Sequence, residues 1–326
     1  MNKTNKRVNA FFLSILLINL GAPVLLSFLA SGGVKMGTMM SLVLTQLLIL
    51  VPSLVFLLIF RCDISEWIPF KKLKAGTVLL IILFTFLIMP FISLINVISQ
   101  LFTENEVIGI SEGFVGISPV IVIVMVGFIG PFCEEFTFRG LIFGGLKRSG
   151  YVFAAAVISA IFFGLMHLNL NQMCYALVMG VLFSMLVEAS GSIWASIIAH
   201  AVINTWNIAQ LYIVENVYSK LGMDVFDMVE DTFDTDMKLG MIGILAAVSA
   251  VTMLLAAGAF IGIYEHEGRK EQVTAMFCRP EVSVDDDEKG STPLVTFCGY
   301  VAMLICLFVI FFLDKAVAYY NTVMGK

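Results

Sequence analysis

The chain has 326 residues, of which 60% are hydrophobic and only 13% are charged. Soluble globular domains contain about 45–50% apolar and about 25% charged residues, so this composition excludes a soluble globular protein. The formal net charge is −5, and the chain has no basic patch of the kind that binds nucleic acid. The lipid bilayer is therefore the expected partner, and nucleic acid is not.

Apolar runs long enough to cross a hydrocarbon core of about 30 Å recur along the whole chain. We count nine of them, with eight or ten as alternative counts, and predict an all-α polytopic membrane protein. In chain order the runs are residues 9–30, 37–60, 77–102, 118–140, 151–168, 171–190, 192–213, 239–263 and 294–313.

The start of the chain and the cysteines add two expectations. The first apolar run follows the basic stretch MNKTNKR but lacks a clear A-x-A cleavage site, so we expect a retained first span. The six cysteines show no paired spacing typical of disulfides or of a zinc knuckle. Nothing in this pattern indicates a cysteine-based site.

Lysine and arginine residues predict the orientation, because cytoplasmic loops carry an excess of them. With a cytoplasmic N-terminus and alternating spans, 13 of the 19 basic residues fall in cytoplasmic segments and five fall outside. The cytoplasmic set includes residues 71–74, 147–148 and 269–289. The sequence therefore predicts a cytoplasmic N-terminus, a cytoplasmic loop at residues 265–293 and an outer loop at residues 214–238.

Polar side chains concentrate between residues 118 and 213, whereas the flanking runs are nearly pure Leu, Ile, Val, Phe and Met. An ionisable group at bilayer depth costs roughly 2.5–3.5 kcal/mol, so such groups usually mark function. We expect a core of four helices at 118–213 that carries the site, with scaffold helices at 1–117 and 214–326. Among the three histidines only His266 falls outside this core, in a charged loop.

The first polar motif, GPFCEEFTFRG, contains Glu134, Glu135 and Arg139. Pro131 precedes the glutamates and predicts a kink that opens backbone groups beside them. Residues four apart share a helix face, so Glu135 and Arg139 are expected to form an ion pair that offsets the cost of burying both. Glu134 has no cation four residues on, and its carboxylate is expected to be free to act as a general base.

Two histidines lie in apolar runs: His167 one turn after Phe163, and His200 one turn before Asn204. Two interpretations stay open. In the first, Glu134 and His167 activate a water molecule, while His200 and Asn204 donate hydrogen bonds to an oxyanion. In the second, Glu134, His167 and His200 are ligands of Zn²⁺ and leave a fourth position for water.

The ordered motifs carry a family resemblance. They are E-E-x-x-x-R (Glu134, Glu135, Arg139), F-x-x-x-H (Phe163, His167) and H-x-x-x-N (His200, Asn204). This set resembles the CPBP family of intramembrane proteases, which comprises type II CAAX prenyl endopeptidases and bacterial bacteriocin-processing or immunity proteins. The resemblance covers residues 118–213, and its specificity comes from three motifs in the right order.

The resemblance implies an intramembrane endopeptidase that hydrolyses a peptide bond of a membrane-associated protein or peptide. Members of the family have been described both as metalloproteases and as glutamate proteases without metal, so Zn²⁺ is one of two expectations for the cofactor. By motif position, the implied catalytic residues are Glu134, His167, His200 and Asn204, and the implied structural residues are Glu135 and Arg139.

The plain multi-span composition, without eukaryotic targeting signals, predicts a protein of a bacterial cell membrane. Peptide or bacteriocin processing, immunity, and cleavage of a membrane regulator are then the candidate roles. The alternative is a non-proteolytic polytopic protein, either an immunity partner that only binds or a transporter. A transporter would more often show inverted repeats and broken helices in pairs, which the sequence does not display.

The predicted orientation is tested with cysteines engineered at positions 230 and 285. An impermeant thiol reagent applied to intact cells is expected to label position 230 and to leave position 285 unlabelled until the cells are opened, because the basic residues place 285 inside. Protection of position 230 in intact cells would contradict the orientation.

Overall fold

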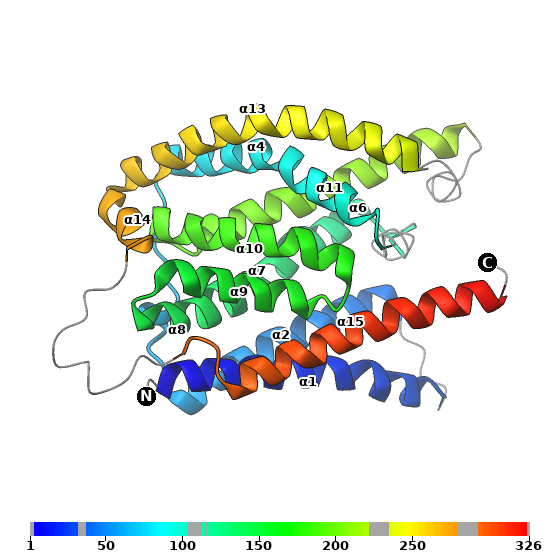
Figure 1. The fold of residues 1–326 in the computed structure, drawn as a ribbon, viewed down its shortest axis with the longest axis horizontal. Coiled ribbons are helices and arrows are strands. Elements are labelled where there is room, and N and C mark those ends of the chain that lie inside the picture. Colours follow the sequence, from blue (N-terminus) through cyan, green and yellow to red (C-terminus); the bar gives the residue numbers. More distant parts are fainter. Residues whose placement is uncertain are drawn as a thin grey trace.

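The structure, a computed structural model, describes residues 3–31, 37–103, 113–114, 116–221, 235–278 and 293–324. Within these ranges every regular element is a helix, and the long helices lie side by side along the long axis of the molecule (Figure 1). A hydrocarbon core offers no water to unpaired backbone groups, so an apolar chain satisfies them within helices. The predicted all-α polytopic membrane protein is confirmed.

The described residues form nine long helical segments, which we call rods, and eight of them are continuous α-helices. They are α1 (Lys3–Ser31), α2 (Thr38–Phe60), α4 (Ala75–Ser99), α9 (Val152–Met166), α10 (Leu170–Ser190), α11 (Trp194–Lys220), α13 (Thr235–Glu267) and α15 (Phe297–Met324). Two short helices, α3 (Ile64–Trp67) and α14 (Lys270–Met276), lie in connections between rods.

A ninth rod, fourth along the chain, covers residues 119–149 and changes its helical register along its length. Its elements are α6 (Pro119–Val122), the π-helical η1 (Ile123–Ile129), α7 (Gly130–Glu135), the π-helical η2 (Phe136–Phe143), α8 (Gly144–Leu146) and the 3₁₀ turn η3 (Lys147–Ser149). The predicted run, 118–140, ended too early. The helical segment continues to Ser149, and at Gly144 the missing side chain lets it approach α3, since a Cβ there would lie 2.5 Å from the Trp67 carbonyl oxygen.

The nine predicted apolar runs each fall on one rod of the described chain. By length and composition, six of the described rods can cross a membrane: α2, α4, the fourth rod, α10, α11 and α13. Shorter apolar stretches occupy α9 and residues 297–312 of α15.

The polar core lies between two groups of scaffold helices (Figure 1). Helices α4 and α13 pair on one side, where the rings of Phe84 and Phe260 lie 6.1 Å apart. On the other side are α1, α2 and α15, and the ring of Phe12 in α1 stacks on Phe162 of α9 at 4.0 Å. Each group thus combines helices from the beginning and the end of the chain around the 118–213 core.

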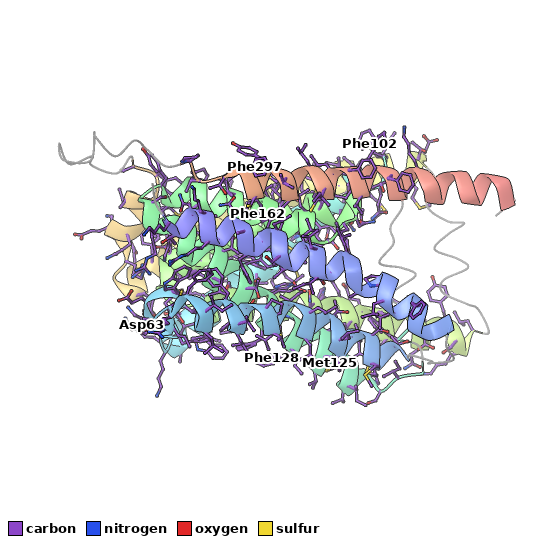
Figure 2. The ribbon with its side chains drawn as sticks, turned by 90° about the horizontal axis from the view of Figure 1, so that it is seen from below. Asp63, Phe102, Met125, Phe128, Phe162 and Phe297 are labelled. Atoms are coloured by element: carbon purple, nitrogen blue, oxygen red, sulfur yellow. The ribbon has the colours of Figure 1, made fainter. Side chains whose placement is uncertain are left out.

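The view from below shows how apolar side chains divide between the core and the surface (Figure 2). Phe162 lies inside the bundle and is fully buried. In contrast, Phe102, Phe128 and Phe297 are 79%, 52% and 81% exposed. Large exposed apolar side chains of this kind are what a lipid-facing surface requires.

One end of the bundle collects the basic segments that the orientation prediction assigns to the cytoplasm: the start of α1, the chain around α3, η3 and α14 (Figure 1). Glu188, near the end of α10, also lies there. Its carboxylate pairs with Lys147 at 2.5 Å, and its backbone oxygen accepts a hydrogen bond from Arg269 at 2.6 Å. These ion pairs fasten the ends of three elements together.

Two details of the loops differ from the prediction. The expected cytoplasmic loop 265–293 begins with helical residues, and His266 is in the last turn of α13, where its Nδ1 lies 2.8 Å from Thr77 Oγ1 of α4. The expected outer loop 214–238 is helical at both ends as well. The proposed labelling positions, 230 and 285, lie outside the described residues.

Candidate active site

The ion pair predicted between Glu135 and Arg139 is present. Arg139 Nη1 donates to Glu135 Oε1 at 2.9 Å, and both side chains are completely buried. The guanidinium also lies over the ring of Phe163, with Cζ 4.2 Å from the centroid, and 5.3 Å from that of Phe183. A buried carboxylate and guanidinium must be paired in this way, because an isolated charge here would cost several kcal/mol.

His200 shares the same carboxylate, which the sequence did not reveal. Its Nδ1 lies 2.9 Å from Glu135 Oε1, and its Nε2 lies 3.8 Å from Glu134 Oε2. An ionised carboxylate can only accept, so Nδ1 carries the hydrogen and Nε2 is directed toward Glu134. Glu135, predicted to be structural, therefore also orients His200.

His167 is oriented by the end of its own helix. It caps α9, where backbone carbonyls have no helical partner, and its Nδ1 lies 2.9 Å from the Phe163 carbonyl oxygen. Since a carbonyl only accepts, Nδ1 carries the hydrogen, and neutral His167 presents the lone pair of Nε2. The Phe163 ring supports this orientation edge-on, with centroids 5.0 Å apart.

Asn204 is held by a backbone carbonyl that Pro131 leaves without a helical partner. In the π register of η1, the Gly130 N–H donates to the Met125 carbonyl five residues earlier. The next bond would join residue 131 to Val126, but proline has no N–H. Asn204 Nδ2 donates to this Val126 carbonyl instead, at 3.0 Å. Pro131 thus leaves the Val126 carbonyl open to Asn204, whereas the kink expected at this proline stays a prediction.

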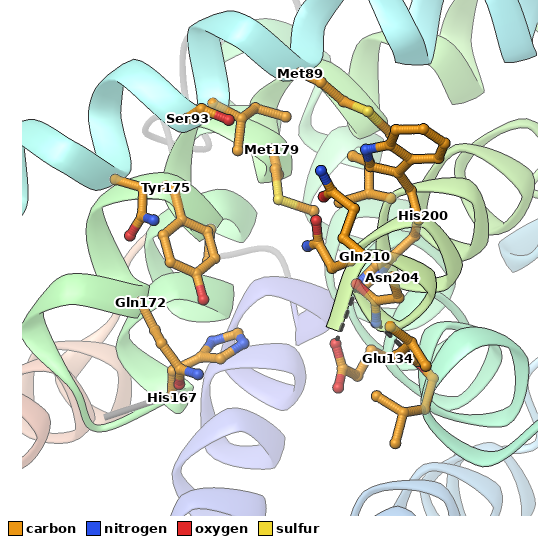
Figure 3. Close-up of a pocket in the computed structure, with 18 of the residues that line it drawn as sticks. Met89, Ser93, Glu134, His167, Gln172, Tyr175, Met179, His200, Asn204 and Gln210 are labelled. Atoms are coloured by element: carbon orange, nitrogen blue, oxygen red, sulfur yellow. Dashed lines mark hydrogen bonds and ion pairs between the residues drawn. The ribbon is translucent and has the colours of Figure 1, made fainter. Parts of the chain in front are cut away.

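A cavity of about 460 Å³ brings four of the predicted residues together (Figure 3). Glu134, His167, His200 and Asn204 all line it. The Glu134 side chain is 22% exposed, whereas that of Glu135 is fully buried behind it. The two adjacent glutamates thus occupy different environments, as their helical positions predicted.

The metal interpretation requires three side chains to converge. In the part of the chain that the structure describes, no group of three His, Cys, Asp or Glu side chains is arranged to hold a metal ion. In Figure 3 His167 lies across the cavity from Glu134 and His200. The arrangement does not fit a three-ligand zinc site, so we derive no chemical step through a metal.

A family model matches this region, and a curated protein is similar to part of the chain. Residues 116–206 match the family described as "Type II CAAX prenyl endopeptidase Rce1-like". A curated relative, "Putative membrane peptidase YdiL" of Bacillus subtilis (strain 168), is 36% identical over 97 residues, which cover 29% of this chain and 40% of the relative. The chain thus matches less than half of that relative's length. No solved structure matches.

The shared carboxylate predicts a stability difference between two glutamate-to-glutamine variants. Glu135→Gln is expected to cost about 3–5 kcal/mol of stability, because it leaves Arg139 and His200 buried without their anion. Glu66→Gln, which breaks the exposed pair with Arg148, is the matched control and should change little. Thermal unfolding of the purified proteins in detergent measures both, and equal melting temperatures would contradict the prediction.

Proposed function

We propose that this chain is an intramembrane endopeptidase of the CPBP family, because residues 116–206 match the type II CAAX prenyl endopeptidase Rce1-like family and part of the chain is similar to a putative membrane peptidase. Its substrate would be a membrane-associated protein or peptide, cleaved by a water molecule that glutamate and histidine activate. The observation that carries the proposal is the contrast between an accessible Glu134 and a buried Glu135, which face the same imidazole of His200.

In the proposed reaction, Glu134 acts as the general base. Its carboxylate takes a proton from water as the water oxygen attacks the carbonyl carbon of the scissile bond. The free Nε2 of His167 accepts the water's other hydrogen and so orients its lone pair toward the carbonyl. As the C–N bond breaks, Glu134 returns its proton to the leaving nitrogen.

The oxyanion of the tetrahedral intermediate needs donors that are already in place. Asn204 uses one amide hydrogen on Val126 and has a second one for the substrate. His200 can donate from Nε2 only as an imidazolium, since Nδ1 donates to Glu135 in either state. Glu135 stabilises that imidazolium, as the buried aspartate does in a serine-protease triad.

Glu134→Gln tests the proposed general base. Glutamine keeps the size of the side chain but cannot accept the proton, so kcat is expected to fall by about 10²–10⁴ with the melting temperature unchanged. Purified protein in lipid nanodiscs, assayed on a pool of internally quenched peptides, provides the measurement, with Glu66→Gln as control. Equal activity of Glu134→Gln and wild type would exclude the protease, whereas binding without turnover in the wild type would favour a non-enzymatic immunity partner.

The cofactor is tested by exhaustive chelation followed by metal analysis. A zinc enzyme should lose activity with chelator and regain it with near-stoichiometric Zn²⁺. We expect full activity in metal-free protein, because Asn204 beside His200 suits an oxyanion site better than a zinc site. In that case His200→Ala and Asn204→Ala should both lower kcat, each by about 10²–10³, with little change in KM. Loss of bound metal in His200→Ala alone would instead identify His200 as a ligand.

A further inference from the structure

The cavity beside the proposed catalytic groups has a neutral polar lining. Apart from Glu134 and the two histidines, its lining among the described residues contains no ionisable group other than the phenol of Tyr175. Its other polar side chains are uncharged, and most of them are amides. The amides are Asn96 of α4, Gln172 of α10, and Asn204, Asn207 and Gln210 of α11.

The amides of α11 form a row that begins at His200. Asn204, Asn207 and Gln210 follow it at intervals of four, three and three residues, which keeps them on one side of the helix. From His200 to Gln210 the helix rises about 15 Å at ~1.5 Å per residue. That rise matches roughly four to five residues of extended chain at ~3.3 Å each.

We place the mouth of the cavity between α4 and α11, because the exposed residues of its lining lie on these two helices. The exposed lining residues are Ser93 on α4 and Trp206, Asn207 and Gln210 on α11. Ser93 is six residues, or about 9 Å, from the end of α4, and Gln210 is ten residues, or about 15 Å, from the end of α11. The opening is therefore on the side of the bundle, within its apolar length.

The surface beside this mouth is aromatic. Trp206 is 45% exposed, and its ring meets that of Phe86 on α4 edge-on at 5.6 Å. Such a rim suits a segment that arrives from an apolar medium. A charged segment would bind there with lower affinity, because moving a charge into apolar surroundings is unfavourable.

An extended peptide segment inside this cavity needs hydrogen-bond partners for its backbone. Its N–H and C=O groups are unpaired, and burying them without hydrogen bonds is unfavourable. Amide side chains suit this task because each can both donate and accept. A charged side chain of the substrate would find no opposite charge except Glu134 or the His200 imidazolium, both of which the proposed reaction needs.

We propose that the cavity binds an uncharged, extended peptide segment, which enters from the lipid between α4 and α11. Asn207 and Gln210 are the specificity-determining residues, and they hydrogen-bond the backbone of the segment beyond the scissile bond. The assignment of a scissile bond rests on the proposed function, whereas the binding of the segment does not.

Three pools of internally quenched peptides, matched in length and apolar content, test the charge requirement. One pool is neutral, one carries lysine and one carries aspartate at the central positions. Binding is measured by fluorescence anisotropy with the Glu134→Gln protein in nanodiscs, on the same sequences carrying the fluorophore without its quencher, so that hydrolysis is not needed. The neutral pool is expected to bind at least about tenfold more tightly than either charged pool. Equal binding of the three pools, or binding of none, would overturn the proposal.

The amide row is tested in the same Glu134→Gln background. Asn207→Leu and Gln210→Leu should each weaken binding of the neutral pool by about fivefold to tenfold, because each leaves backbone groups unpaired. Asn216→Leu is the matched control, as Asn216 is exposed on the same helix and does not line the cavity. Weakening by all three variants alike, or by none, would contradict the assignment.

The route of entry is tested with a neutral peptide that carries a benzophenone. Crosslinks are expected within residues 86–96 and 206–210, on the two sides of the mouth, and crosslinks confined to the basic end of the bundle would exclude lateral entry.

The proposed protease function and the proposed selectivity for neutral segments can be contradicted separately. If the protein binds the neutral pool selectively but the wild type cleaves no pool, only the proposed protease function is contradicted. If the wild type cleaves all pools at equal rates, only the proposed selectivity for neutral segments is contradicted.

Discussion

The site depends on one buried carboxylate, that of Glu135. It binds Arg139 and His200 through the same oxygen, each at 2.9 Å, and the side chains of Glu135 and Arg139 are fully buried. In an apolar bundle each of these three groups would be costly alone, and their shared contacts offset part of that cost. Glu135 Oε2 and Arg139 Nε and Nη2 are buried without a hydrogen-bond partner among the described residues. The arrangement fixes the tautomer of the His200 imidazole, and with it the direction in which Nε2 faces the cavity.

A second constraint comes from the backbone of the fourth rod. Its π-helical stretches place Val126 and Pro131 five residues apart in the hydrogen-bonding register, and the missing proline N–H frees a carbonyl for Asn204. π-Helical segments are rare and frequently occur at functional sites. Here the irregular register links η1 and α11, and both carry residues that line the cavity.

The scaffold helices position this core from two sides. The pair α4 and α13 forms one wall, and α4 also contributes Ser93 and Asn96 to the cavity. On the other side, close approach at Gly144 brings α3 against the fourth rod. Helices outside residues 116–206, the region that the family model matches, thus also shape the cavity.

The sequence by itself determined the helical class, the approximate spans and the ion pair of Glu135 with Arg139. Apolar run lengths and the 3.6-residue period are local properties, so they can be read along the chain. The contact of Glu135 with His200, 65 residues apart, was decided only by the tertiary structure, and so was the bond from Asn204 to Val126. The position of the cavity mouth likewise depends on how α4 packs beside α11. These features require the rotation and spacing of helices relative to one another, which no local pattern specifies.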